Sequence, residues 1–235
     1  MGKNKELDYT GERIVHDKMH CDVVNLILHL NRYVFSLKYC VNKKVLDIAC
    51  GTGYGMSLIS NLAKNLEGID IDKDTIDWAK KKNFFNCPTK FKIKNLEKDR
   101  ISGNFDSIIF FETIEHLDRP GVFLKSIKNT LSDCGILVFS VPVNEPYNKF
   151  HKRNYDWDSI QELIKKYFSP HIEWYSQTID GIFSGKKKNA LAIIGVAYKN
   201  LPPFPKMVKK SINNKIFFLR KKTKELLRLS PKTRW

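Results

Sequence analysis

Three groups of residues in this sequence have the types and the spacing that chemistry at a ligand site requires. The first is the stretch VLDIACGTGYG at residues 45–55, in which an apolar run carries Asp47 and leads into a glycine-rich turn. Glycines such as Gly51 and Gly53 let a backbone pass close to a ligand, and the helix expected after the turn presents free N–H groups to an anionic group. The stretch therefore predicts a binding loop for a nucleotide-like ligand.

The glycine spacing of this loop narrows the kind of ligand. It reads G-x-G-x-G, and Met56 stands where a dinucleotide-binding loop has its third glycine. This spacing weighs against hydride transfer with a nicotinamide cofactor. The second group, EGIDID at residues 67–72, is a strand ending in carboxylates about twenty residues further on, and Asp70 is the predicted acceptor of two ribose hydroxyls. Asp72 is the alternative ribose ligand, or else the cap of the next helix.

The third group lies in FDSIIFFETIEHL at residues 105–117, a strand that ends in two carboxylates and a histidine. Open α/β sheets bind ligands at the carboxyl ends of their strands, so Glu112, Glu115 and His116 are expected at the cleft. Histidine has the ordinary pKa closest to neutrality, which makes His116 a candidate base for a hydroxyl nucleophile. Alternatively, Glu115 and His116 only cap the next helix. His151 is a second candidate base or acceptor ligand, against the alternative of a surface histidine.

These groups need an alternation of strands and helices to hold them together. Short apolar β-branched runs alternate with segments of helical periodicity, a pattern typical of βαβ units. The predicted strands span residues 44–49, 66–70, 90–93, 105–111, 135–141, 172–177 and 190–197. The predicted helices span residues 21–39, 55–63, 74–82, 120–131 and 157–168. The expected fold class is α/β, a Rossmann-like seven-stranded, mostly parallel sheet with helices on both faces.

The basic character of the chain is concentrated at its carboxyl end. The formal net charge is +16, of which the last 31 residues hold +10. Three prolines soon after residue 200 predict the end of a domain over residues 1–200, with residues 1–40 as its N-terminal cap region, followed by a tail over residues 201–235. Residues 206–229 predict a basic amphipathic helix. Packing on the domain or on a second subunit, and attachment to an anionic membrane surface, are its two alternative roles.

Composition excludes several other classes. The first residues contain no apolar run typical of a signal peptide, and no stretch of about 18 uncharged apolar residues occurs. The five cysteines are odd in number and form no C-x-x-C pair, so neither a disulfide framework nor a zinc site is expected. No residue cluster in the sequence requires a metal. The expected location is the cytoplasm, or the inner face of the membrane if the tail attaches there.

The pattern D-x-A-C-G-T-G-x-G after an apolar strand resembles the first cofactor motif of class I S-adenosylmethionine-dependent methyltransferases. The resemblance implies a cofactor site formed by Arg13, Asp47, Ala49, Gly51, Gly53, Asp70, Ile71, Asn95, Leu96 and Glu112. Asn95 stands where the family usually has an acidic residue against the adenine, so this sequence departs from the pattern there. Arg13, in YTGERIV at residues 9–15, would pair with the cofactor carboxylate.

Further segments resemble particular subgroups of that family. E-x-x-E-H-L is similar to the small-molecule O-methyltransferases of ubiquinone biosynthesis and their sugar-modifying relatives. YTGERIV, HLNRYVFSLKYC and the segment around His151 resemble glycan-associated methyltransferases, although NEPYNKFH has extra residues before the histidine. These resemblances imply methyl transfer to a hydroxyl of a sugar or glycan, whether nucleotide-linked, lipid-linked or polymeric. His116, His151 and Glu115 would be the catalytic residues.

Three other functions stay open from the sequence. Methylation of an amino sugar or small amine would use Glu112 and Glu115 to hold the amine. A nucleic-acid-binding or RNA-modifying protein would account for the net charge of +16, but that charge lies mostly in the tail and no N-P-P-[YF] or D-P-P-[YF] motif occurs. The third alternative is a non-catalytic cofactor-binding protein. We expect a small-molecule or glycan acceptor and no specific nucleic acid, and the sequence defines no oligomeric state.

Overall fold

The computed structural model describes residues 23–81, 85–143, 148–168 and 171–200. The chain divides into two units, Met1–Leu201 and Pro202–Trp235, and every described residue belongs to the first. Arg13 and the predicted basic helix over residues 206–229 therefore lie outside the described residues. Within the described part of the chain, no helix has the length and apolar character needed to cross a bilayer.

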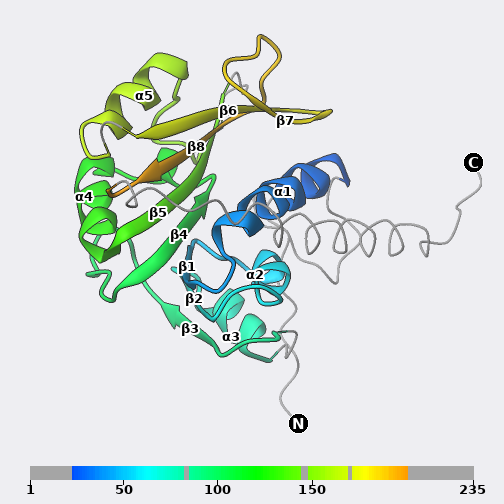
Figure 1. The fold of residues 1–235 in the computed structure, drawn as a ribbon, viewed down its shortest axis with the longest axis vertical. Helices are drawn as coiled ribbons and strands as arrows, with labels where there is room; N and C mark the ends of the chain where they lie inside the picture. Colours follow the sequence, from blue (N-terminus) through cyan, green and yellow to red (C-terminus); the bar gives the residue numbers. More distant parts are fainter. Residues whose placement is uncertain (1–22, 82–84, 144–147, 169–170, 201–235) are drawn as a thin grey trace, which may run out of the picture. The chain divides into compact units, whose positions relative to one another are not determined.

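An eight-stranded sheet forms the centre of the fold (Figure 1). The strands are β1 (Lys44–Ile48), β2 (Asn65–Asp70), β3 (Thr89–Ile93), β4 (Phe105–Phe111), β5 (Leu131–Pro142), β6 (Ile172–Thr178), β7 (Gly181–Ser184) and β8 (Ala192–Tyr198). Their order across the sheet is β3-β2-β1-β4-β5-β8-β6-β7. The strands β1 to β5 pair in parallel, so their carboxyl ends share one edge, whereas β8 joins β5 and β6 in antiparallel fashion.

Helices cover both faces of this sheet. The helices are α1 (Val23–Ser36), α2 (Tyr54–Ile59), α3 (Lys73–Lys81), α4 (Pro120–Thr130) and α5 (Trp157–Lys165), with short 3₁₀ helices η1 (Leu37–Tyr39) and η2 (Ile114–His116). In Figure 1, α4 and α5 lie on one face, and α1, α2 and α3 lie on the other. The prediction of a mostly parallel α/β sheet with helices on both faces is confirmed.

The predicted number of seven strands is wrong, because the sequence analysis missed β7. This strand pairs with β6 from Thr178↔Gly181 to Tyr175↔Ser184, so only Ile179 and Asp180 separate the two strands. Four residues on the edge of a sheet are too few to show a period of two, and half of β7 is exposed. The short connection therefore reads as a loop when only the sequence is known.

Aromatic side chains pack closely together at the centre of the sheet. Phe110 of β4 lies between Phe123 of α4 and Phe139 of β5, with ring centroids 5.3 Å and 5.4 Å away. The Trp174 ring of β6 lies 5.8 Å from that of Phe139. Gly195 of β8 makes this close approach feasible, because a Cβ there would come within 2.2 Å of the Phe139 ring. The core thereby holds β4, β5, β8 and β6 in fixed register.

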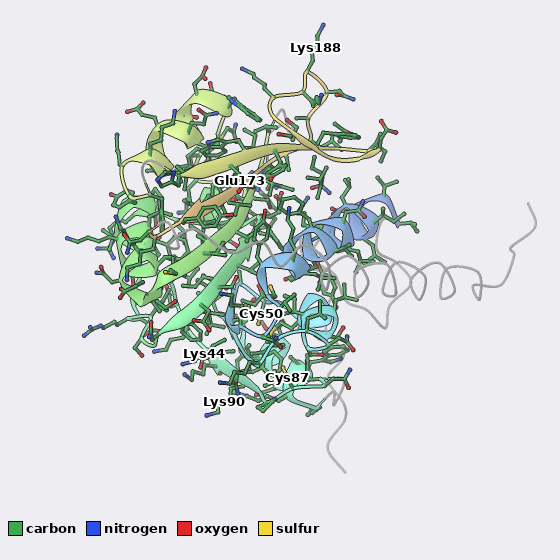
Figure 2. All side chains as sticks on the ribbon, in the orientation of Figure 1. Lys44, Cys50, Cys87, Lys90, Glu173 and Lys188 are labelled. Carbon is green, nitrogen blue, oxygen red and sulfur yellow. The ribbon has the colours of Figure 1, made fainter. Side chains whose placement is uncertain are left out.

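The strand β3 forms one edge of the sheet and carries a row of charge. Its residues Lys90 and Lys92 are exposed, and Figure 2 labels Lys90 at this edge. The Lys92 ammonium lies 2.6 Å from the Glu67 carboxylate of the neighbouring β2. The outer strand therefore presents lysine side chains beside its backbone.

Candidate active site

The predicted cofactor loop connects β1 to α2 at the carboxyl edge of the sheet, where Figure 2 labels Cys50. Ala49, Gly51 and Gly53 have φ angles of 55°, 54° and 75°, so the backbone enters the left-handed region three times before α2 begins at Tyr54. A Cβ built on Gly51 would meet no heavy atom within 4 Å. The loop therefore leaves open space beside its backbone, as close contact with a ligand requires.

Asp70 ties this loop to the end of β2. Its Oδ2 accepts a hydrogen bond from the Gly51 N–H at 2.9 Å, and its Oδ1 accepts one from the Asp72 N–H at 3.0 Å. The carboxylate of Asp72 instead accepts from the Thr75 N–H at 2.7 Å, in the first turn of α3. Of the two acids considered from the sequence, Asp72 caps the helix and Asp70 holds the loop.

Asp47 lies in β1, two residues before the loop begins at Ala49. Its side chain is buried, and its Oδ2 accepts a hydrogen bond from the Tyr33 hydroxyl of α1 at 3.0 Å. Burial, with a smaller contribution from the Asp70 charge, raises the pKa of Asp47 to about 8, against the opposing effect of the Tyr33 hydrogen bond. Burial also raises the pKa of Tyr33, so the tyrosine remains the donor of this bond. Asp47 therefore links the strand that leads into the loop to α1.

A cavity of about 320 Å³ opens beside the loop. It is lined by Ala49, Ile69, Asp70, Ile71, Lys94, Asn95, Leu96, Glu97, Glu112, Thr113, His116 and Leu117. Its volume falls at the lower end of the roughly 300–1,000 Å³ typical of small-molecule sites. The structure thus brings together residues that the sequence analysis selected at the ends of β1, β2, β3 and β4. The other predicted cofactor residues in the described part are not among the lining residues: Asp47 lies in β1, and Gly51 and Gly53 follow Ala49 in the loop.

The wall after β3 combines apolar side chains with one amide. The Asn95 Oδ1 accepts a hydrogen bond from the Glu97 N–H at 2.9 Å, and the Asn95 N–H donates to the Asp99 carboxylate at 2.7 Å. With its Oδ1 held in this turn, the Nδ2 group is the polar atom that Asn95 offers to a base edge. Leu96 and Ile71 line the same cavity as apolar surfaces. This wall suits a planar, partly polar ring such as adenine.

Arg32 of α1 is a site residue that the sequence analysis did not select. It is buried, its Nε donates to the Gln177 Oε1 at 2.6 Å, and its Nη1 lies 3.3 Å from the Glu112 Oε1. The Ser140 hydroxyl of β5 donates to the same Glu112 oxygen at 2.8 Å. Glu112 therefore lines the cavity while it is held by a cation and a hydroxyl from two other elements.

Two non-glycine residues at this edge have strained backbones. Ala49 follows β1 with a φ of 55°, and Glu112 follows the adjacent β4 with a φ of 48°. A left-handed conformation costs a residue with a Cβ about 1–2 kcal/mol, and such strain persists where the surroundings determine the conformation. Both residues line the cavity. The strain is therefore located where two neighbouring strands meet the ligand space.

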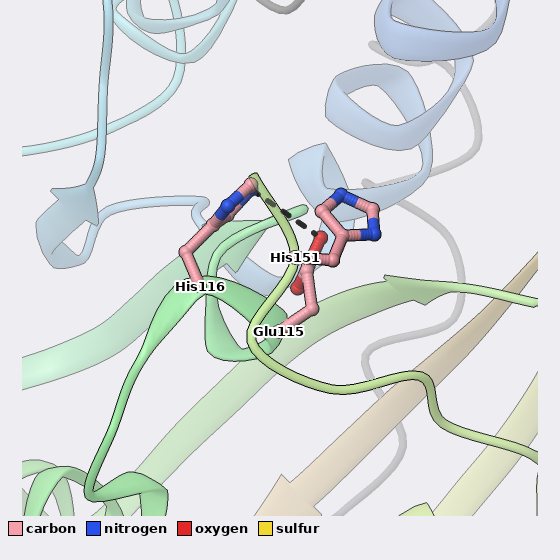
Figure 3. A group of neighbouring side chains, drawn as sticks. All are labelled: Glu115, His116 and His151. Atoms are coloured by element: carbon pink, nitrogen blue, oxygen red, sulfur yellow. Dashed lines mark ion pairs between the residues drawn. The ribbon is translucent and has the colours of Figure 1, made fainter. Parts of the chain in front are cut away.

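Glu115, His116 and His151 come together as a group (Figure 3), and His116 also lines the cavity. Glu115 is fully buried, and its Oε1 lies 4.0 Å from the His116 Nε2. The rings of the two histidines meet edge to face, with centroids 4.8 Å apart. All three residues were predicted from the sequence, and the segment after β5 brings His151 to the other two.

Hydrogen bonds fix which nitrogen of each neutral histidine can accept a proton. The His116 Nδ1 lies 3.1 Å from the Phe150 carbonyl oxygen, which can only accept, so Nδ1 carries the hydrogen and Nε2 keeps its lone pair. The Asn148 Oδ1 accepts from the Phe150 N–H at 3.0 Å, which directs the Asn148 Nδ2 to the His151 Nε2 at 3.2 Å. His151 therefore accepts at Nε2 from this amide, while the Nε2 of His116, a residue that lines the cavity, keeps its lone pair.

The same three residues form a group with the composition of a cation site. One ligand atom from each of Glu115, His116 and His151 lies within 4.8 Å of the others. A carboxylate and two imidazoles are suitable ligands for several divalent ions. No such group was predicted from the sequence, because His116 and His151 are too far apart in the chain to form a short metal-ligand motif. The arrangement is therefore compatible with proton transfer and with a bridging cation.

The fold and this edge of the sheet define a class I S-adenosylmethionine-dependent methyltransferase: a glycine loop follows β1, an acid ends β2, and a cavity joins them to β3 and β4. A family model for the methyltransferase domain matches residues 29–180, and the chain belongs to that family. The cofactor is S-adenosylmethionine.

Individual relatives agree with this assignment. The chain is 26% identical over 168 residues to a probable S-adenosylmethionine-dependent methyltransferase of Mycobacterium tuberculosis, a match that covers 67% of this chain and 60% of that protein. It is 25% identical over 154 residues to a mitochondrial ubiquinone biosynthesis O-methyltransferase of Saccharomyces cerevisiae, covering 59% and 49% of the two chains. The chain thus spans less than two thirds of the length of either relative.

Solved structures show the same fold. A TehB-like S-adenosylmethionine-dependent methyltransferase of Corynebacterium glutamicum superposes with a TM-score of 0.57 at 19% identity, covering 73% of this chain and 88% of that one. The DhpI–SAH complex gives a TM-score of 0.60 at 14% identity over 80% and 91% of the two chains. At these identities the likeness concerns the fold.

Proposed function

We propose that this methyltransferase transfers the methyl group of S-adenosylmethionine to a hydroxyl of a sugar or glycan, nucleotide-linked, lipid-linked or polymeric. The observation that carries the proposal is that His116 lines the cavity and keeps the lone pair of its Nε2, because its Nδ1 donates to the Phe150 carbonyl. A base of this kind suits a hydroxyl acceptor, which gains nucleophilicity as its proton leaves.

The reaction needs little more than positioning and one proton transfer. Bound S-adenosylmethionine would supply the methyl group and leave as the neutral thioether, and the His116 Nε2 would take the proton of the acceptor hydroxyl. Glu115, whose Oε1 lies 4.0 Å from this nitrogen, stabilises the imidazolium that forms. His151 packs edge to face on His116 and holds the ring in place.

The choice of acceptor rests on two supports. Several relatives, including those of Saccharomyces cerevisiae and Schizosaccharomyces pombe, are named ubiquinone biosynthesis O-methyltransferases, and an oxygen acceptor agrees with a histidine base. The sugar or glycan rests on the resemblance of the segments around Arg13 and His151 to glycan-associated methyltransferases. Methylation of an amine is the competing outcome.

The test is a product assay with three acceptor panels: sugars and nucleotide sugars, phenols, and amines, each incubated with labelled S-adenosylmethionine and resolved by mass spectrometry. Methylation of a sugar hydroxyl supports the proposal, and methylation of amines alone contradicts it.

Turnover of the His116→Gln variant should fall by about 10²–10⁴-fold with little change in cofactor affinity. His171→Gln, a partly buried histidine directly before β6, is the control. Loss of activity in EDTA, restored by Zn²⁺ or Mn²⁺, would assign the three side chains to a cation instead.

We also propose that the domain over residues 1–200 carries the catalytic function in the cytoplasm, and that the basic tail over residues 201–235 attaches it to the inner face of the membrane. The support is the apolar stripe among basic residues between 206 and 229. The full chain should sediment with vesicles containing anionic lipid and lose this binding in high salt. Deletion after residue 205 should abolish it, and retained binding would exclude the tail as the anchor.

A further inference from the structure

Exposed apolar side chains are concentrated at one place in the described part of the chain. Of the ten large apolar residues that are exposed there, six come from the start of α1 and from the segment between the end of β6 and the start of β8. Scattered single residues of this kind are normal on a protein surface, whereas a concentration of them marks an interaction site. The six residues are Val23, Val24, Ile27, Ile179, Phe183 and Leu191.

These residues lie around the end of β6. Helix α1 contacts β7, and the Gln177 amide of β6 donates to the Leu28 carbonyl of α1 at 2.7 Å. The Leu191 N–H, directly before β8, donates to the Gln177 carbonyl at 2.8 Å. In Figure 1 the start of α1 and the turn between β6 and β7, which holds Ile179, lie beside each other. The end of β6 therefore joins the apolar residues of α1 to those that follow β6.

The loop after β7 adds positive charge to this group. Lys186, Lys187 and Lys188 are exposed, and Figure 2 shows Lys188 at the tip of the loop. The Lys187 Nζ lies 5.9 Å from the centroid of the Phe183 ring, so a cation and an apolar side chain are adjacent. Residues 181–200 contain no acid. We call the six exposed apolar residues and these three lysines the β7 surface.

The β7 surface adjoins the edge of the sheet that carries the cavity. Strand β8 pairs in antiparallel fashion with both β5 and β6, so β6 runs in the direction of β5 and ends at the same edge. Arg32 donates to Gln177, two residues before Ile179, and its Nη1 lies 3.3 Å from Glu112, which lines the cavity. Whatever the β7 surface binds therefore lies at the edge of the sheet that holds the cavity.

Apolar side chains beside lysines match the chemistry of an anionic membrane. The apolar side chains can enter the boundary between headgroups and acyl chains, while the lysines reach the lipid phosphates. On the proposed transfer to a sugar hydroxyl, we infer that the β7 surface docks the cavity edge on an anionic membrane and that the acceptor is a sugar carried by a lipid of that membrane. The basic tail would only tether the chain, whereas the β7 surface orients the cavity edge toward the lipid.

The first test is hydrogen exchange of the full chain, with and without vesicles of equal parts phosphatidylcholine and phosphatidylglycerol. The exchange rate should fall by at least about twofold at residues 179–191 and stay unchanged at residues 120–130 of α4. Because the measurement is local, the tail does not affect it. Unchanged exchange at residues 179–191 would overturn the docking surface. Slowed exchange there in concentrated protein without vesicles would assign the surface to a second copy of the chain instead.

The second test compares two forms of one sugar, a polyprenyl diphosphate conjugate in those vesicles and a water-soluble methyl glycoside. Ile179→Asp combined with Lys188→Glu should lower kcat/KM by about tenfold for the lipid-linked form and leave the soluble form unaffected. Val122→Asp combined with Lys125→Glu makes the same changes at exposed positions of α4 and is the matched control. It should keep both activities.

The outcomes separate this inference from the proposed function. An equal loss of turnover on both forms, or faster turnover of the soluble form by the natural protein, would overturn the lipid-linked acceptor while leaving methyl transfer to a sugar intact. Slowed exchange with vesicles but methylation of no sugar in either form would overturn the proposed function and leave the membrane contact.

Discussion

The guanidinium of Arg32 and the carboxylate of Glu112 form an ion pair, 3.3 Å apart, between α1 and the end of β4. Arg32 also donates to Gln177 of β6, and the Gln177 amide donates to the Leu28 carbonyl of α1 at 2.7 Å. One buried arginine thus joins α1 to the end of β4 and to β6. The position of a cavity-lining carboxylate depends on this connection.

Replacing Arg32 by methionine keeps most of the side-chain volume and removes the charge. Glu112 and Gln177 then lose their partner in a mostly buried setting, so the free energy of unfolding should fall by about 2–3 kcal/mol, below the usual cost for fully buried pairs because Glu112 keeps some solvent contact. Urea unfolding measures the change. Lys73→Met, which removes an exposed pair with Asp77 on α3, is the control and should have little effect. A fall no larger than that of the control would show that Arg32 is not a structural connection.

Because Ala49 has a left-handed conformation, replacing alanine by glycine should have opposite effects on the free energy of unfolding at Ala49 and at Ala79. Ala49→Gly removes the steric cost of a φ of 55°, so the free energy of unfolding should rise by up to about 1 kcal/mol. Ala79→Gly, inside α3, should lower it by about 1 kcal/mol or more, because glycine is costly in a helix. Chemical denaturation of both variants tests the pair. Equal effects at the two positions would contradict the strain assigned to the loop.

Alanine substitutions at Gly51 and Gly55 should have different effects on cofactor binding and on the stability of the fold. A Cβ at Gly51 meets no atom within 4 Å, so Gly51→Ala incurs only left-handed strain, about 1–2 kcal/mol, and places its methyl group in the ligand space. At Gly55 a Cβ would come within 2.1 Å of the Tyr33 ring, so Gly55→Ala should destabilise the fold more strongly. Thermal unfolding and cofactor titration distinguish the two. Normal cofactor binding by Gly51→Ala would remove that loop position from the site.

Asp47 also predicts a pH dependence of stability. Its pKa is raised to about 8 in the folded protein, above the ordinary aspartate value, so the folded state holds a proton that the unfolded state has lost. Its contribution is fully present below about pH 4 and is lost as the pH rises to about 8. Asp47→Asn has no such proton, so its stability relative to the natural protein should increase across this interval. A difference independent of pH would show that Asp47 is ionised in the fold.

His29 of α1 should act with the opposite sign. Burial and the Arg32 charge lower its pKa to about 3, and its Nδ1 lies 3.0 Å from the Tyr54 hydroxyl. The folded state keeps this histidine neutral, so its contribution is present above about pH 6.5 and is lost as the pH falls toward 3. His29→Asn should therefore lose less stability on acidification than the natural protein does, as measured by urea unfolding between about pH 7 and pH 5. Parallel curves would contradict the lowered pKa.

The parts of the site that could be predicted from the sequence each lie within a short stretch of the chain. The loop from Asp47 to Gly53 and the strand ending at Asp70 each show their role within a few residues, because an apolar run, an acid and glycines must follow one another there. The parallel sheet then places the ends of β1, β2 and β4 side by side. For this reason residues selected one strand at a time line one cavity.

What the sequence left hidden depends on contacts between distant segments. Arg32 and Gln177 are 145 residues apart, and neither residue type indicates a site until the fold joins them. His116 and His151 were both selected as candidate bases, but their contact depends on the path of the loop after β5, which no periodicity describes. The strand β7 was missed because its four residues are too short for a pattern.

The lysines on β3 bear on how these molecules behave at high concentration. The outer backbone groups of an edge strand are a template onto which another chain can add a strand, the first step toward aggregates. With Lys90 and Lys92 exposed on that strand, a second copy approaching in the same way would bring two rows of ammonium groups together. Their mutual repulsion protects this edge, and acetylation of the two lysines would leave it open to strand addition.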